Sequence, residues 1–167
     1  MRIPSAIRFL PLFVFLSCGS DTPVRDSEEL IIKNPRASEC GGFPPASKRA
    51  ADPDSSAVEK LSWTYNSGSG VLTVLNTGVK LNCCGVHSIT AFRDGDAIVV
   101  SENDQPGDKG RCRCMCNYDF SVEIGGIASG AVEVRLELTV DDTLFRKWSG
   151  TIRPADGRGE IIVPKAE

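Results

Sequence analysis

The chain has 167 residues, of which 41% are hydrophobic and 25% charged, with a formal net charge of −3, one histidine and seven cysteines. This composition is typical of a globular protein, and the length indicates one domain with additional segments. The negative charge argues against a nucleic-acid partner, because phosphate binding needs a basic face, and no apolar run approaches the roughly 18 residues of a membrane-spanning helix.

Residues 1–17 have the pattern of a secretory signal peptide. Arg2 and Arg8 supply the positive start, and Phe9 to Leu16 form an apolar run that is too short to span a bilayer. A run of this length fits the hydrophobic region of a signal peptide. We therefore predict that the chain is exported from the cytoplasm.

The signal peptide ends in Val14-Phe15-Leu16-Ser17-Cys18-Gly19, which resembles the lipobox of bacterial lipoproteins. The resemblance implies that Cys18 becomes the first residue of the mature chain and carries acyl chains such as palmitate. The family pattern prefers leucine three places before the cysteine, where this chain has Phe15, and an ordinary secretory signal cleaved elsewhere is the alternative. By resemblance to the Gram-negative sorting rule, Gly19 favours the outer membrane.

The lipid is the only membrane attachment that the sequence predicts. Removing residues 1–17 takes away two arginines and no acid, which leaves 17 basic and 22 acidic side chains and a net charge of −5. Such a chain is not attracted to anionic headgroups, so the acyl chains on Cys18 have to hold it at the membrane. The expected location is the bacterial cell envelope.

Residues 18–57 are predicted to form a flexible tether between the lipid anchor and a folded domain. The segment is rich in charges and contains five prolines, a composition that opposes compact structure. Its one apolar island is Leu30-Ile31-Ile32. Cys40 departs from the linker pattern, because a thiol in an exported protein is expected to be joined to the domain.

From residue 58 onward, apolar side chains recur with the period of two that is typical of β-strands. Asp94-Gly95 between two apolar runs is a favoured hairpin turn. The longest alternation puts seven residues on one parity: Cys112, Cys114, Cys116, Tyr118, Phe120, Val122 and Ile124. One long strand over 112–124 would therefore direct all three of its cysteines toward the core.

These strands and the turn signals between them predict an all-β fold, an antiparallel β-sandwich of about eight strands over residues 58–167. In size and architecture the domain resembles immunoglobulin-like and fibronectin-III-like domains. The hallmarks of those domains are missing, since Trp63 lies in the first strand and no tyrosine stands two residues before the second cysteine. The resemblance is therefore one of architecture and implies no ligand.

Six cysteines remain once Cys18 is acylated: Cys40, Cys83, Cys84, Cys112, Cys114 and Cys116. An even number outside the cytosol predicts disulfides. Cysteines two apart on a strand have Cα atoms about 6.8 Å apart, at the limit for a disulfide, and adjacent ones point to opposite faces. The simplest pairing joins each of the first three to one of the last three, which leaves six connectivities open and staples the tether and the 83–84 turn to the long strand.

The alternative interpretation is a soft-metal site. Cys83, Cys84 and His87 lie in one turn that could face the 112–116 cysteines, and thiolates with an imidazole suit Zn²⁺ or Cu(I). The paired Cys-x-x-Cys spacing of zinc sites is absent, however. Apart from this alternative, no cofactor is predicted.

The sequence contains no Gly-x-Ser-x-Gly elbow, phosphate-binding loop or His-Glu-x-x-His motif. Its single histidine also excludes mechanisms that need two imidazoles. We therefore predict a non-enzymatic, lipid-anchored binding or structural module of the envelope, with an unidentified protein or carbohydrate partner. The alternative function is a periplasmic Cu- or Zn-binding protein that uses the cysteines and His87.

Overall fold

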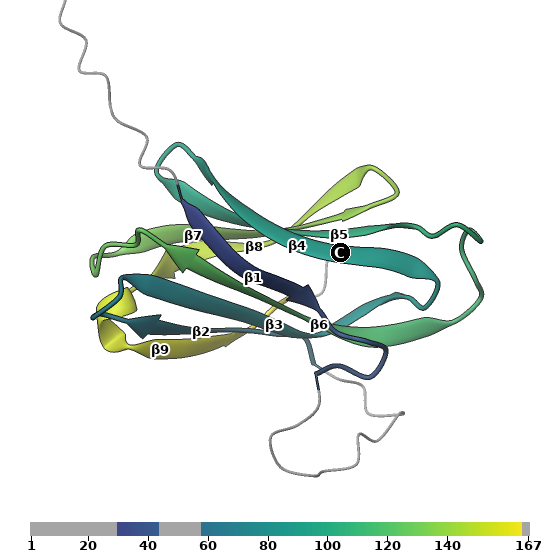
Figure 1. The fold of residues 1–167 in the computed structure, drawn as a ribbon, viewed down its shortest axis with the longest axis horizontal. Helices are drawn as coiled ribbons and strands as arrows, with labels where there is room; N and C mark the ends of the chain where they lie inside the picture. Colours follow the sequence, from purple (N-terminus) through teal and green to yellow (C-terminus); the bar gives the residue numbers. More distant parts are fainter. Residues whose placement is uncertain (1–29, 44–57, 165–167) are drawn as a thin grey trace, which may run out of the picture.

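The computed structural model describes residues 30–43 and 58–164, which form nine β-strands and a short 3₁₀ turn (Figure 1). The strands form two sheets packed face to face, which confirms the predicted all-β sandwich. The elements are β1 (Ile31–Ala37), β2 (Lys60–Asn66), β3 (Val71–Asn82), β4 (Gly85–Asp94), β5 (Ala97–Pro106), β6 (Met115–Gly125), β7 (Val132–Val140), β8 (Thr143–Ile152), η1 (Pro154–Asp156) and β9 (Arg158–Ile162). The predicted signal peptide and Cys18 lie outside the described residues.

The five-stranded sheet has the strand order β1-β6-β3-β2-β9, and the four-stranded sheet has the order β4-β5-β7-β8. The core between them follows the predicted alternation: Phe120, Val122 and Ile124 of β6 are fully buried, as are Leu72 and Val74 of the adjacent β3. Burying each such side chain stabilises the fold by roughly 1.5–3 kcal/mol. Packing therefore determines which face of β3 and β6 is internal. Over residues 30–43 and 58–164, no helix has the length and apolar character needed to cross a membrane.

β5 and β7 form a parallel pair, whereas the other six strand pairings of the described residues follow the predicted antiparallel pattern. After β5 the chain crosses to the five-stranded sheet as β6 and then returns as β7 beside β5. Two reversals of direction leave β7 running the same way as β5. The period of a strand carries no information on this crossing, because it is the same in parallel and antiparallel sheets.

β1 is an edge strand that pairs antiparallel with β6. The structure therefore corrects the tether predicted over 18–57, because residues 31–37 belong to the sandwich. The register shifts between Lys33 and Arg36, and Pro35 lies in this irregularity. Prolines and charged side chains are tolerated at sheet edges and bulges, so the residues that suggested a linker are compatible with a strand in this position.

The strand predicted over 112–124 begins later, at Met115. Cys112 and Cys114 lie in an irregular segment before β6, whereas the alternation within β6 keeps the predicted parity. The prediction that one straight strand carries all three cysteines is therefore corrected. Hydrogen bonds between the Asn82 side chain and the backbone of Cys112 hold the start of this segment.

The β4–β5 hairpin turns one residue later than its sequence suggests. Asp94 pairs with Ala97, so the two turn residues are Gly95 and Asp96. Gly95 has a φ of 61°, and Asp96 is not among the residues with positive φ. Glycine at the first position, with left-handed backbone there alone, is the pattern of a type II′ turn.

Candidate functional site

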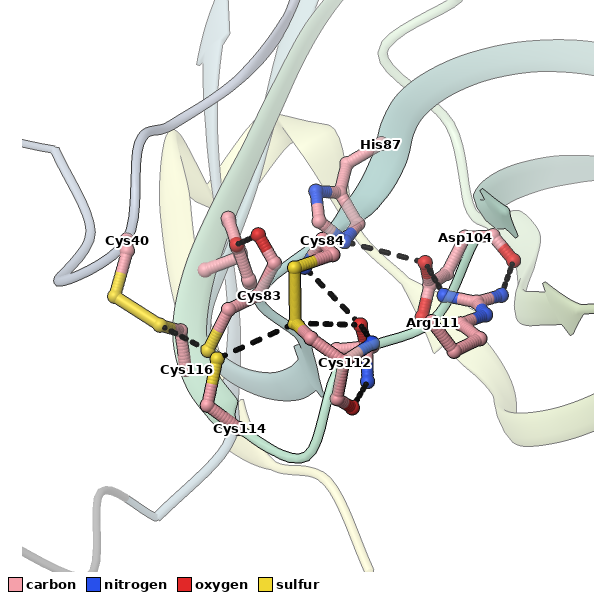
Figure 2. The surroundings of a disulfide bond; sticks show 11 residues. Cys40, Cys83, Cys84, His87, Asp104, Arg111, Cys112, Cys114 and Cys116 are labelled. Atoms are coloured by element: carbon pink, nitrogen blue, oxygen red, sulfur yellow. Dashed lines mark hydrogen bonds and ion pairs between the residues drawn. A yellow bond between two sulfur atoms is a disulfide. The ribbon is translucent and has the colours of Figure 1, made fainter. Parts of the chain in front are cut away.

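The six cysteines gather at one end of the sandwich, and we call them the sulfur cluster (Figure 2). They come from three segments: Cys40 follows β1, Cys83 and Cys84 lie in the β3–β4 turn, and Cys112, Cys114 and Cys116 lie before and within the first residues of β6. The pairing of β6 with both β1 and β3 brings these segments together. The cluster is thus a product of the tertiary fold.

Two disulfides form within the sulfur cluster. Cys40 is bonded to Cys116, with Cα atoms 5.4 Å apart, and Cys84 is bonded to Cys112, with Cα atoms 5.7 Å apart. Each bond joins one of Cys40, Cys83 and Cys84 to one of the three later cysteines, which is the pattern that the sequence predicts. The first bond ties the segment after β1 to β6, and the second ties the β3–β4 turn to the loop before β6.

Asn82, at the end of β3, organises the bonded turn. Its Oδ1 accepts hydrogen bonds from the backbone N–H groups of Cys84 (3.0 Å) and Cys112 (3.3 Å), and its Nδ2 donates to the carbonyl oxygen of Cys112 (2.7 Å). Asn82 was not among the predicted site residues. The available signal was an asparagine two residues before a turn position, because asparagine side chains commonly bond the backbone two residues on.

Cys83 and Cys114 are thiols in this structure, so the predicted third bridge is not formed. The Cys83 Sγ lies 2.9 Å from the Sγ of Cys116, and the Cys114 Sγ lies 3.4 Å from the Sγ of Cys112. A hydrogen bond with the Cys114 side chain, followed by burial, raises the pKa of Cys83 above its ordinary value. The protonated thiol is therefore favoured, and it is a weaker nucleophile and metal ligand than a thiolate.

His87, the imidazole of the alternative metal site, is buried in a different environment. Its ring packs against Tyr118 with centroids 4.0 Å apart, and its side chain is 6% exposed. The Nε2 lies 3.2 Å from Asp104 Oδ1 without hydrogen-bond geometry. Burial lowers the pKa of His87, although the Asp104 carboxylate opposes this change. The imidazole is therefore held mainly in its neutral form.

This arrangement does not bring the residues of the alternative metal site together as a set of ligands. Figure 2 shows His87 directed toward Asp104, while two disulfides engage four of the six sulfurs. Within residues 30–43 and 58–164, no three or more histidine, cysteine, aspartate or glutamate side chains are placed to hold a metal ion. A metal would therefore require a different redox state of the sulfur cluster.

Arg111 fixes the loop that carries the later cysteines. It donates to Asp104 Oδ1 (2.5 Å) and to the Asp104 carbonyl oxygen (2.7 Å), and its Nε donates to Asp141 Oδ1 (3.1 Å). Gly85 lies against this group, where a Cβ atom would overlap the Asp104 carboxylate. Asp104 and Arg111 were not among the predicted site residues, because they lie in the polar run of residues 103–111, which is equally typical of an exposed loop.

A second buried polar group lies inside the core. Glu102 and Asn76 have no exposed surface, and Asn76 Nδ2 donates to Glu102 Oε1 (2.8 Å) and to Glu59 Oε1 (2.9 Å). The other carboxylate oxygen of Glu59 pairs with Lys147. Burial raises the pKa of Glu102 to about 8, so this carboxyl is protonated at neutral pH. Because it is sealed from solvent, it does not form a substrate site.

The outer face of the five-stranded sheet is hollowed into a shallow groove of about 410 Å³. It is lined by Arg36, Phe43, Ser62, Trp63, Thr64, Thr73, Leu75 and Ser121. The Arg36 guanidinium lies over the Phe43 ring, 5.2 Å from its centroid. Hydroxyl groups beside aromatic rings are suited to a polar ligand with an apolar face, so this surface is a binding candidate.

Comparison with known proteins found no matching family model, no matching curated protein and no matching solved structure.

Proposed function

We propose that this protein is a non-enzymatic binding or structural module of a bacterial cell envelope, held to the membrane by a lipid on Cys18. The observation that carries the proposal is the pair of disulfides that join Cys40 to Cys116 and Cys84 to Cys112. Disulfides form and persist outside the reducing cytosol, as expected for a chain that begins with a secretory signal. The resemblance of the residues before Cys18 to a lipobox supports the membrane anchor and the outer membrane as its location.

Two properties of the described residues support a binding role over catalysis. The thiol of Cys83 has a raised pKa, and the neutral imidazole of His87 faces Asp104. The groove on the outer sheet face instead offers an open surface with aromatic, hydroxyl and guanidinium groups, to which a protein or carbohydrate partner can bind. Insulin reduction by the purified protein is accordingly expected to show no turnover.

The anchor is tested by labelling bacteria that express the full chain with a palmitate analogue. We expect the wild type to incorporate the label and Cys18→Ser to lose it, because the acyl chains attach at that residue. Cys114→Ser is the matched control and should remain labelled, since it replaces one exposed cysteine but leaves Cys18 in place. An unlabelled wild type, or a Cys18→Ser variant that keeps the label, would contradict the lipid anchor.

A second candidate function, soft-metal binding, is favoured by one observation, the gathering of six sulfurs at one end of the fold. Reduction of the disulfides would free thiolates suited to Zn²⁺ or Cu(I). Elemental analysis of the protein purified from the envelope without chelators distinguishes the candidates. Stoichiometric copper or zinc supports the metal protein, and metal-free protein with intact disulfides supports the binding module.

A further inference from the structure

We propose that Cys83 and Cys114 form a third disulfide in the oxidised protein, so that all six cysteines of the sulfur cluster are paired. The first observation is the strand register. The β3–β6 ladder ends with Asn82 opposite Met115, and the next opposed pair is Cys83 with Cys114. The Cys83 N–H donates to the Cys114 carbonyl oxygen at 3.1 Å, which continues the ladder by one step. Opposed residues in such a pair have Cα atoms about 5.5 Å apart, a common spacing for disulfides.

The second observation is the position of the two thiols. Residues opposite each other in a ladder point to the same face, and the backbone hydrogen bond from Cys83 to Cys114 places these two residues opposite each other. Each sulfur also contacts one existing disulfide, Cys83 at Cys116 and Cys114 at Cys112. Figure 2 shows the two thiols between the two bonds. The fold has therefore already brought together the only two unpaired cysteines of the described residues.

The bond forms by thiol–disulfide exchange with a disulfide oxidant, such as an exported oxidoreductase or glutathione disulfide. One thiolate of the pair attacks the oxidant and forms a mixed disulfide, and the second thiolate then displaces the oxidant's sulfur. The oxidant's disulfide accepts two electrons. It also takes up the two protons that Cys83 and Cys114 lose, and it leaves as two thiols. The reaction needs no metal and no lipid anchor.

The third bond has a different role from the other two. The Cys84–Cys112 bond already closes nearly the same loop, so a bond between Cys83 and Cys114 removes little further freedom from the unfolded chain. Its effect is to fix which cysteines are bonded to each other. A free Cys83 thiolate beside Cys116 can attack the Cys40–Cys116 bond, which forms Cys83–Cys116 and releases Cys40 as a thiolate. Pairing Cys83 with Cys114 removes that nucleophile.

The test is oxidative folding of the full chain carrying Cys18→Ser, which removes the seventh thiol. After equilibration in a glutathione redox buffer, acid quenching and unfolding, free thiols are counted with a thiol reagent. We expect the same count, zero, in this protein and in a variant that also carries Cys83→Ser and Cys114→Ser. The single change Cys114→Ser should give one free thiol and a mixture of isomers that includes the Cys83–Cys116 bond, because it leaves Cys83 without its partner.

Peptide mapping assigns the bond. Trypsin cuts after Arg111 and Arg113, which separates Cys112 from Cys114 and Cys116, while Cys114 and Cys116 stay in one peptide. Fragmentation between Cys83 and Cys84, and between Cys114 and Cys116, then shows which two sulfurs are joined. A bond between Cys83 and Cys114 is the expected result, and a bond between Cys83 and Cys116 would contradict it. Two more free thiols in the Cys18→Ser protein than in the variant without Cys83 and Cys114, or attachment of Cys114 to Cys84, would overturn the proposal. So would copper or zinc bound to the two thiols in protein purified without reductant. None of these outcomes depends on acylation, so they are independent of the palmitate test.

Discussion

Asn82 joins two segments of the sulfur cluster without being a cysteine. Its amide bonds the backbone of Cys84 on one side and of Cys112 on the other, the same two residues that the second disulfide connects. The same two residues are therefore joined both by a disulfide and by hydrogen bonds to the Asn82 side chain. The asparagine positions the two backbones, and the disulfide holds them together once the sulfurs meet.

We predict that Asn82→Ala lowers the free energy of unfolding by about 1–2 kcal/mol with the disulfides intact, because three hydrogen bonds are lost, two of them partly buried. Urea denaturation followed by tryptophan fluorescence measures the change. Asn66→Ala is the matched control. Its Oδ1 accepts from Gly68 and Ser69 in an exposed turn, so we expect a loss of about 0.5 kcal/mol or less. Equal losses in the two variants would refute the special role of Asn82.

Glu102 is a second single residue with a measurable consequence. Its carboxyl titrates near pH 4.5 in the unfolded chain, whereas burial raises the pKa to about 8 in the folded protein. Between these pH values the folded state binds more protons than the unfolded state, so stability falls as pH rises. This dependence is opposite in sign to that of a carboxylate held by a salt bridge.

We predict that the contribution of Glu102 costs the wild type roughly 4 kcal/mol of stability by pH 8, relative to pH values below 4.5. Glu102→Gln keeps an acceptor for Asn76 but cannot ionise, so its stability should exceed that of the wild type increasingly toward pH 8. Urea denaturation at a series of pH values measures the difference. Glu133→Gln, an exposed carboxyl on β7, should leave the pH profile unchanged. Parallel profiles for the wild type and Glu102→Gln would show that the buried carboxyl does not titrate in this range.

At the scale of elements, β1 is the strand whose attachment depends most on the sulfur cluster. It lies at a sheet edge and pairs with β6 alone. After it, Ser38 N–H donates to the Asp119 carbonyl oxygen (2.8 Å), Phe43 N–H donates to Asp119 Oδ2 (2.9 Å), and the Cys40–Cys116 bond lies between these contacts. Edge pairing, side-chain bonds and one disulfide thus hold a strand with mostly exposed side chains.

We predict that Cys40→Ser combined with Cys116→Ser accelerates hydrogen exchange of the β1 amides, because the strand can then separate from β6 without global unfolding. Mass spectrometry of deuterium uptake in peptides covering residues 31–43 measures this change. Cys84→Ser combined with Cys112→Ser removes the same number of bonds and should leave β1 protection close to that of the wild type. Equal uptake in both double variants would indicate that β1 is held by its ladder alone.

β1 and β6 also show how far the sequence predicts this fold. The alternation of Phe120, Val122 and Ile124 identifies a strand and its buried face, because burial acts on each side chain locally. β1 was not predicted, since an edge strand with few buried side chains has no such alternation. The start of β6 was misplaced because Cys112 and Cys114 continue the parity, while the Asn82 contacts that draw the chain away come from a distant segment.

At the scale of the whole molecule, the two disulfides lie at one end of the sandwich. The segments that meet around Tyr65 are held by packing against the core and by two hydrogen bonds, from Tyr65 N–H to the Gly157 carbonyl oxygen (2.7 Å) and from the Tyr65 hydroxyl to the Ile127 carbonyl oxygen (2.8 Å). The number of cysteines and their division into two groups of partners follow from sequence. The position of His87 beside Asp104 could not be predicted from sequence, because it depends on how β4 and β5 pair.

The inclusion of β1 in the sandwich changes how far the domain can move from a bilayer. A free linker running from Cys18 to residue 57 would reach roughly 130 Å when fully extended, at about 3.3–3.6 Å per residue. Leu30 is the first described residue of the domain and lies 12 positions after Cys18, so the chain allows at most roughly 40 Å between the two. If β1 separates from β6, the Cys40–Cys116 bond still holds the chain at residue 40, which limits the reach to roughly 75 Å. A partner would therefore have to meet this domain close to the membrane surface.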